Sequence, residues 1–146
     1  MKRLFIIAAI ATAVVATACG EKKKSNAEMI TSHEWLLDEI LYDGQEFTET
    51  PPSNVTLIFS DSTNRIAGRG GCNNFFGTYE LKDDKDITVD VGGATMMACP
   101  HLEFEGKYFD LLREVKEYKV TKDELRLNAV PKGATLVYKP TLKAVE

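Results

Sequence analysis

Short runs of alternating apolar and polar residues constrain the fold of this chain more than any other feature. In the segment VTLIFS, the residues Val55, Leu57 and Phe59 fall on one face. The same spacing recurs in ITVDV at residues 87–91 and in ELRLN at residues 124–128. Period-two alternation in short runs is typical of β-strands with one buried face. The chain is therefore expected to be mainly β.

Clusters of turn-forming residues separate these runs. They read YDG at 42–44, TPPSN at 50–54, SDSTN at 60–64, KDDKD at 82–86 and TKDE at 121–124. Strands joined by short turns form meandering antiparallel sheets. We therefore predict one small domain, either an antiparallel β-barrel or a strongly curved sheet.

One segment departs from this alternation. In EFEGKYFDLLREVKEY, the apolar residues at 104, 108, 111, 112 and 115 share one face of an α-helix. We predict an amphipathic helix at about residues 103–117 that covers the open side or end of the sheet. Gly106 lowers its helix propensity by up to about 1 kcal/mol relative to alanine.

The N-terminus has the pattern of an exported protein. Lys2 and Arg3 precede an apolar run from Leu4 to Val15, which is shorter than the roughly 20 residues that span a bilayer. The small residues before Cys19 resemble the lipobox of bacterial lipoproteins, in which the cysteine is lipidated. Ordinary cleavage after Ala18 is the alternative, and it would give a soluble secreted protein.

These signals divide the chain into four parts. We expect a signal peptide at 1–18, a lipidated Cys19 with a flexible tether at 19–32, one domain at 33–140 and a tail at 141–146. The lipid would hold the domain at a membrane of the bacterial cell envelope, facing the periplasm. Loss of Lys2 and Arg3 with the signal peptide changes the formal net charge from −4 to −6. So acidic a domain argues against a nucleic-acid partner.

Cys72 and Cys99 are left once Cys19 is assigned to the lipid. An even pair in an oxidising compartment predicts a disulfide. Closing this loop of about 28 residues would contribute roughly 3.6 kcal/mol on the chain-entropy account. Free buried thiols are the second interpretation. The third is a reactive site. Cys99 and His101 could act as nucleophile and base, or a zinc ion could be bound by Cys72, Cys99, His101 and His33.

No CxxC or HxxxH pair preorganises such chemistry, so we assign no catalytic residue, metal or cofactor. The stretch GGCNNFFGTY at 70–79 has a structural interpretation instead. Gly70 and Gly71 permit a positive φ and a close backbone approach, and asparagine tolerates the same conformations. The stretch therefore predicts a tight corner between strands, held by Cys72.

The same residues resemble the META domain family, which includes HslJ-like heat-shock proteins. GCNNFFGTY at 71–79 is similar to the family signature GCN-x-x-x-G-x-Y. The family's other motifs follow in order over residues 33–139: WLL at 35–37, TMMAC at 95–99, the spacing of Glu105, Tyr108 and Leu112, and ELRL at 124–127. The resemblance implies a small lipocalin-like barrel with one helix, a link to heat stress or drug tolerance, and no enzymatic activity.

Together these observations favour a non-enzymatic envelope lipoprotein that acts by binding. Its expected partners are a membrane, through lipidated Cys19, and an envelope protein. The candidate binding patch consists of Asn73, Asn74, Tyr79, Thr95 and Met96, with Met97 beside it.

Core packing is the alternative for the two methionines and for Tyr79. A barrel that holds a small apolar ligand is the second functional hypothesis. An enzyme that uses a thiol or the carboxylate of Glu105 is the third. We expect Glu105 to act instead as a helix N-terminal acid that interacts with the helix dipole.

Overall fold

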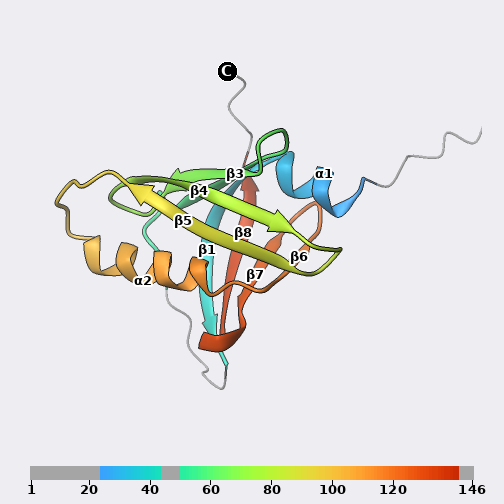
Figure 1. Ribbon diagram of the computed structural model, residues 1–146. Helices are drawn as coiled ribbons and strands as arrows, with labels where there is room; N and C mark the ends of the chain where they lie inside the picture. The colour runs from blue at the N-terminus through green and yellow to red at the C-terminus, as the bar shows by residue number, and fades with distance from the viewer. Residues whose placement is uncertain (1–23, 44–49, 142–146) are drawn as a thin grey trace, which may run out of the picture.

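Eight antiparallel strands form one curled sheet in the computed structural model, which describes residues 24–43 and 50–141 (Figure 1). Their order across the sheet is β5-β4-β3-β2-β1-β8-β7-β6. The strands are β1 (Glu34–Tyr42), β2 (Thr56–Ser60), β3 (Arg65–Arg69), β4 (Asn74–Leu81), β5 (Ile87–Ala94), β6 (Glu117–Val120), β7 (Leu125–Ala129) and β8 (Ala134–Thr141). A single 3₁₀ turn, η1 (Val130–Lys132), precedes β8. Because β1 pairs with both β2 and β8, it joins the two halves of the sheet.

The two edge strands of this sheet, β5 and β6, meet at one end only. Asp86 and Glu117 form an isolated antiparallel bridge. Beside it, the Ile87 N–H donates to the Lys116 carbonyl at 3.0 Å, and the Tyr118 N–H donates to the Lys85 carbonyl at 2.7 Å. The sheet is therefore a strongly curled half-barrel, and the predicted mainly β fold is confirmed.

Because of the alternation in the sequence, every second side chain of a strand points to the concave, inner face of the sheet. Val55 and, on β2, Leu57 and Phe59 are fully buried, whereas their polar neighbours are half-exposed. The interior is filled by large side chains from most of the elements. The largest fully buried ones are Trp35, Tyr108, Tyr138, Phe59, Ile30, Ile40, Leu57, Ile66, Ile87, Leu112, Leu125 and Leu127.

Helix α2 (Leu102–Arg113) packs against β5 and β7, in front of the sheet in Figure 1. The hydroxyl groups of Tyr108 on α2 and Tyr138 on β8 are hydrogen-bonded at 3.1 Å, and both are buried. Burial raises the pKa of both phenols, so the pair stays neutral at physiological pH.

The predicted helix is present but four residues shorter than expected at its C-terminus. It ends because the Glu114 N–H turns back to the carbonyls of Leu111 and Leu112. Val115 is still fully buried. Val115 therefore continues the apolar spacing of the helix although the backbone there is no longer helical. For this reason the sequence predicted a C-terminal end that is too late.

A second helix, α1 (Asn26–Thr31), was not expected. Ser25 and Glu28 form a capping box at its start, Ile30 is fully buried, and the helix contacts β2 and β6. The Trp35 indole N–H donates to the Ile30 carbonyl at 2.8 Å. The prediction of a flexible tether up to residue 32 is therefore wrong for residues 25–32, which belong to the fold.

The proposed signal peptide, Cys19 and the tether up to residue 23 lie outside the described residues, as do residues 44–49 and 142–146. In the part of the chain that the structure describes, neither α1 nor α2 is long and apolar enough to cross a bilayer.

Replacing Ile30 tests whether α1 contributes to the stability of the domain. We expect Ile30→Ala, in the secreted domain carrying Cys19→Ser, to lower the free energy of unfolding by about 2–5 kcal/mol, because a buried side chain is lost. Urea unfolding followed by tryptophan fluorescence measures it. Ala27→Ser, at an exposed position of the same helix, is the control. Equal stabilities of the two variants would show that α1 does not contribute.

Candidate functional site

The connection between β3 and β4 forms a tight corner at residues 70–73. The Gly70 N–H donates to the Asn73 carbonyl at 2.9 Å, and Gly71 has a φ of +110°. A Cβ atom on Gly70 would lie 2.7 Å from the carboxylate of Glu105 on α2. Glycine is needed at both positions, at Gly71 for its φ and at Gly70 for the close approach of the helix. The predicted corner is confirmed.

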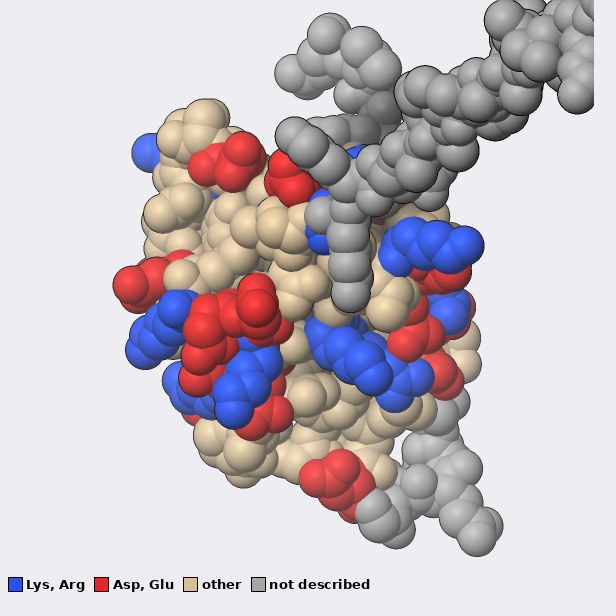
Figure 2. Space-filling model, turned by 90° about the vertical axis from the view of Figure 1, so that its right-hand side faces the viewer, with Lys and Arg blue, Asp and Glu red and all other residues tan. Residues whose placement is uncertain are grey.

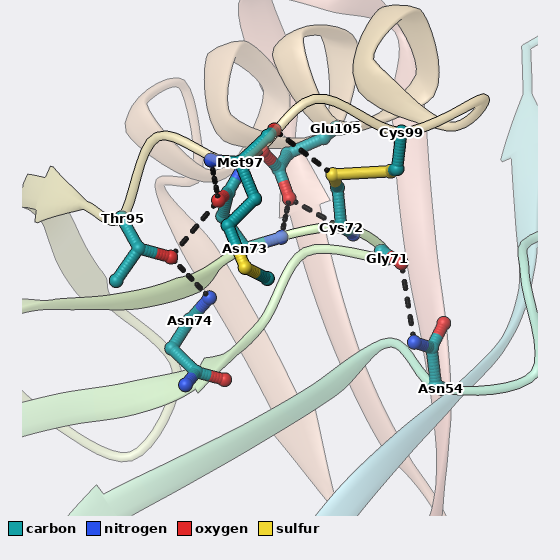
Figure 3. Close-up of a disulfide and its surroundings, with 9 residues drawn as sticks. All are labelled: Asn54, Gly71, Cys72, Asn73, Asn74, Thr95, Met97, Cys99 and Glu105. Atoms are coloured by element: carbon teal, nitrogen blue, oxygen red, sulfur yellow. Dashed lines mark hydrogen bonds between the residues drawn. A yellow bond between two sulfur atoms is a disulfide. The ribbon is translucent and has the colours of Figure 1, made fainter.

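A disulfide joins this corner to the loop that follows β5. It links Cys72 to Cys99, whose Cα atoms are 5.9 Å apart (Figure 3). The favoured pairing of these cysteines is therefore confirmed. Neither sulfur is free to act as a nucleophile or a zinc ligand while the disulfide is intact. The disulfide therefore argues against both the Cys99–His101 nucleophile and the zinc site.

The carboxylate of Glu105 projects from the first turns of α2 into the corner (Figure 3). Oε2 accepts the Cys72 N–H at 3.1 Å and the Asn73 N–H at 2.6 Å. Oε1 accepts the side-chain amide of Asn73 at 2.7 Å. Only 4% of Glu105 is exposed, so these bonds replace the water that the carboxylate loses on burial.

Asn73 carries this network across to the loop after β5. Its Oδ1 accepts the Met97 N–H at 2.6 Å and the Thr95 hydroxyl at 2.9 Å. Its Nδ2 also donates to the Met97 carbonyl at 3.3 Å. The buried Asn73 side chain therefore holds the backbone of residues 95–97, and the disulfide holds the same loop at Cys99.

The side chains on this loop point outward. Met96 is 97% exposed and Met97 is 58% exposed, so the interpretation of both as core residues is wrong. The reason is that Asn73 binds the peptide groups of Met97 and draws the backbone, rather than the side chains, toward the interior.

Beside these methionines, α2 begins with Leu102, which is 45% exposed. Met96, Met97, Ala98 and Leu102 form the apolar rim of a shallow groove of about 300 Å³, which we call the methionine groove. Exposed Thr95 and the buried Asn73 and Glu105 also line it. Soluble proteins more often bury methionine and leucine, so exposed neighbours of this kind mark a candidate contact surface.

A sequence profile described as META domain matches residues 28–142. The chain belongs to the META domain family. This match also begins within α1, in agreement with the inclusion of that helix in the fold. Among proteins with curated descriptions, none matches the chain.

Solved structures share the fold of this META domain. A protein from Burkholderia xenovorans is 25% identical, with a TM-score of 0.67, and the match covers 92% of this chain and 100% of that one. A DUF4847 family protein from Bacteroides vulgatus is 10% identical, with a TM-score of 0.63, over 80% of this chain and 97% of that one. An uncharacterised protein from Bacteroides eggerthii is 19% identical, with a TM-score of 0.50, over 76% and 99%.

The structure brings four of the five predicted patch residues of this META domain together. Asn73 and Thr95 are bonded to each other, the Asn74 N–H donates to the Thr95 hydroxyl at 3.2 Å, and Met96 follows directly. Tyr79 lies toward the other end of β4, where its hydroxyl donates to the Ser60 carbonyl at 3.2 Å. It is buried, and its ring packs edge-on against Phe59.

Sequence reasoning gave Glu105 a different role and did not include Leu102. The side chain of Glu105 bonds to the corner, not to its own helix terminus. The family spacing drew attention to this residue, but no local pattern indicated its partner 32 residues earlier. His33 is bonded to Ser32 and packs against Trp35, whereas His101 precedes α2. Within residues 24–43 and 50–141, no cluster of His, Cys, Asp and Glu could hold a metal ion.

Charge is mixed on the face that includes α1. Figure 2 shows Lys and Arg side by side with Asp and Glu there, without a large area of one sign. This face therefore offers no continuous basic surface of the kind that binds a nucleic-acid backbone.

Glu105→Gln tests the buried network. The glutamine amide has one acceptor oxygen and one donor NH₂ group, so at least one of the three donors that Glu105 binds loses its acceptor. A flip of the Asn73 side-chain amide would not repair this, because its NH₂ group would then face the Thr95 hydroxyl and the Met97 N–H. We expect a loss of about 1–3 kcal/mol in unfolding free energy. Faster hydrogen exchange at the Met97 amide should accompany it. Glu103→Gln, an exposed change two residues away, is the control and should stay within about 0.5 kcal/mol of wild type.

Proposed function

We propose that this protein is a non-enzymatic binding module of the cell envelope that captures an apolar segment of an envelope protein in the methionine groove. The observation that carries the proposal is the contrast between backbone and side chains in the loop after β5. Its backbone is held by Asn73 and by the disulfide, whereas Met96 and Met97 are exposed. Exposed apolar groups on a fixed backbone favour binding, since less entropy is lost when a partner docks.

Methionine suits this role because its side chain is unbranched and polarisable. Such side chains adapt to partners of different shape, and methionine is enriched at protein interfaces. The groove is shallow, and its apolar rim would contact a partner's side chain rather than enclose a whole small molecule.

The second hypothesis, a small ligand inside the barrel, has less support. Trp35, Phe59, Tyr108 and Tyr138 are all fully buried within the curl of the sheet. A half-barrel whose inward positions hold such large side chains leaves the outer surface as the better place for a partner.

The proposal does not include catalysis because the candidate nucleophile and the candidate carboxylate each have a structural role. The thiols of Cys72 and Cys99 are joined in the disulfide, and the carboxylate of Glu105 accepts three hydrogen bonds from the corner. A part in envelope or heat stress or in drug tolerance belongs to the proposal and rests on the family resemblance alone. A lipid on Cys19 would keep the domain at the membrane.

Photo-crosslinking in cells tests the groove. We expect benzoylphenylalanine at position 96 or 97 to give discrete adducts with an envelope protein, because both side chains are exposed at the rim. The same reagent at position 130 is the control, since Val130 is an exposed apolar residue on η1. Leu102→Ser should reduce the adducts from position 96 several-fold. Adducts of equal yield from position 130, or none from 96 and 97, would contradict the proposal.

The lipid anchor has a separate test. We expect the wild-type protein to incorporate labelled palmitate and to partition with membranes, whereas Cys19→Ser should remain unlabelled and leave the membrane fraction. Thr17→Ser, a conservative change before the cleavage site, is the control and should keep the label. Membrane association of Cys19→Ser at the wild-type level would overturn the anchor and leave the groove proposal untouched.

A further inference from the structure

The outer surface of the sheet continues directly from the methionine groove. On this surface Arg69 of β3 pairs with Asn74 of β4. Asn74 in turn accepts the Thr95 N–H at 2.9 Å, and Met96 follows Thr95. Arg69, Asn74, Thr95 and Met96 are all exposed, so they form one continuous strip across the end of β3, β4 and β5.

Phe76 lies next to this strip and is 63% exposed. Its cross-strand neighbours are Ala67 on β3 and Gly93 on β5. A Cβ atom on Gly93 would lie 2.9 Å from the tip of the Phe76 ring, so the ring lies over a bare stretch of backbone. Covering a glycine in this way is a structural role. It does not account for the part of the ring that stays exposed to solvent.

Arg69 supplies the charge of this surface. The side chains of Arg69 and Arg65 are both exposed, and neither takes part in an ion pair or side-chain hydrogen bond within the described residues. Their surroundings differ at the second neighbour. The cross-strand row of Arg65 continues through Thr78 to Asp90, whereas the row of Arg69 continues through Thr56 to Leu36 on one side and reaches Asn74 on the other, without an acidic residue. An unpaired guanidinium without an acidic neighbour is suited to bind a carboxylate in two parallel hydrogen bonds.

We propose that Arg69, Asn74 and Phe76 extend the methionine groove into a single docking surface, and that its occupant is a polypeptide segment that combines apolar and acidic side chains. This inference rests on the proposed function and names the chemistry of the partner. The apolar side chains lie against Met96, Met97 and Phe76, and a carboxylate of the segment pairs with Arg69. Phenylalanine, methionine and arginine are the residue types that interfaces concentrate.

Charge complementarity selects an acidic segment, because this formally acidic chain presents an unpaired cation here. The rim of the groove selects a polypeptide over an acidic polysaccharide, since methionine and leucine side chains offer nothing to sugar hydroxyls. It also disfavours an anionic membrane surface, because Glu103 stands beside Leu102 at the start of α2.

A random linear peptide library displayed on phage provides the probe. The secreted domain with Cys19→Ser is the target, and the enriched peptides are synthesised and titrated by fluorescence anisotropy. We expect the enriched sequences to combine apolar residues with Asp or Glu. Arg69→Glu should weaken the best peptide at least about tenfold. Replacing the acidic residue of that peptide by Lys should restore much of its binding to Arg69→Glu.

Arg65→Glu is the matched control, since it makes the same charge change on the same strand but in the row that contains Asp90. It should weaken the peptide clearly less than Arg69→Glu does. Phe76→Ser should also weaken binding, while circular dichroism and the unfolding midpoint of each variant show that the fold is kept.

The remaining outcomes distinguish the inference from the proposed function. Peptides that need Met96 and Leu102 but ignore the charge at position 69 would overturn the inference and leave the groove proposal standing. Peptides that ignore Met96, Met97 and Leu102 would overturn both. Binding of the domain to polyuronate or to phosphatidylglycerol vesicles that is lost in Arg69→Glu, without acidic peptides, would assign the surface to a different partner and overturn the inference.

Discussion

The buried carboxylate of Glu105 is the interaction on which the geometry of the candidate site depends. Removing a carboxylate from water costs several kcal/mol unless hydrogen bonds replace the lost solvent. Here the replacements come from the backbone of Cys72 and Asn73 and from the Asn73 amide. The position of α2 and the shape of the corner are therefore coupled, because neither can shift without leaving the carboxylate unsatisfied. Gly70 belongs to the same constraint, since any side chain there would collide with Glu105.

Much of this fold follows from local patterns in the sequence. Period-two alternation located strands such as β2 and β5, and the glycine-rich stretch located the corner, because both patterns act over a few neighbouring residues. Helix α1 did not follow from the sequence. It has only six residues and a single buried one, Ile30, so its apolar face is too small to give a period.

The candidate site was less predictable because its partners are distant in the chain. Asn73 and Thr95 were both assigned to the candidate patch and proved to be bonded, but the link from Asn73 to Glu105 crosses 32 residues. The exposure of the two methionines was unpredictable for the same reason, a contact between residues distant in the chain. Their hydrophobicity indicated the core, yet one asparagine that binds the peptide groups of Met97 turns both side chains outward. Such a polar contact leaves no trace in hydrophobic periodicity.

The arrangement separates a rigid framework from an adaptable surface. The disulfide, Asn73 and Glu105 fix the backbone of the loop after β5, and they do so with groups that are mostly buried. The side chains that reach solvent, Met96 and Met97, have several rotatable bonds each and no hydrogen bonds to lose. A partner would therefore meet a backbone that needs no ordering and side chains that can repack against it. Rigidity in the backbone lowers the entropy cost of association, while freedom in the side chains accepts different apolar shapes. Because the interior of the curl is filled, the surface around this loop is where the fold combines both properties.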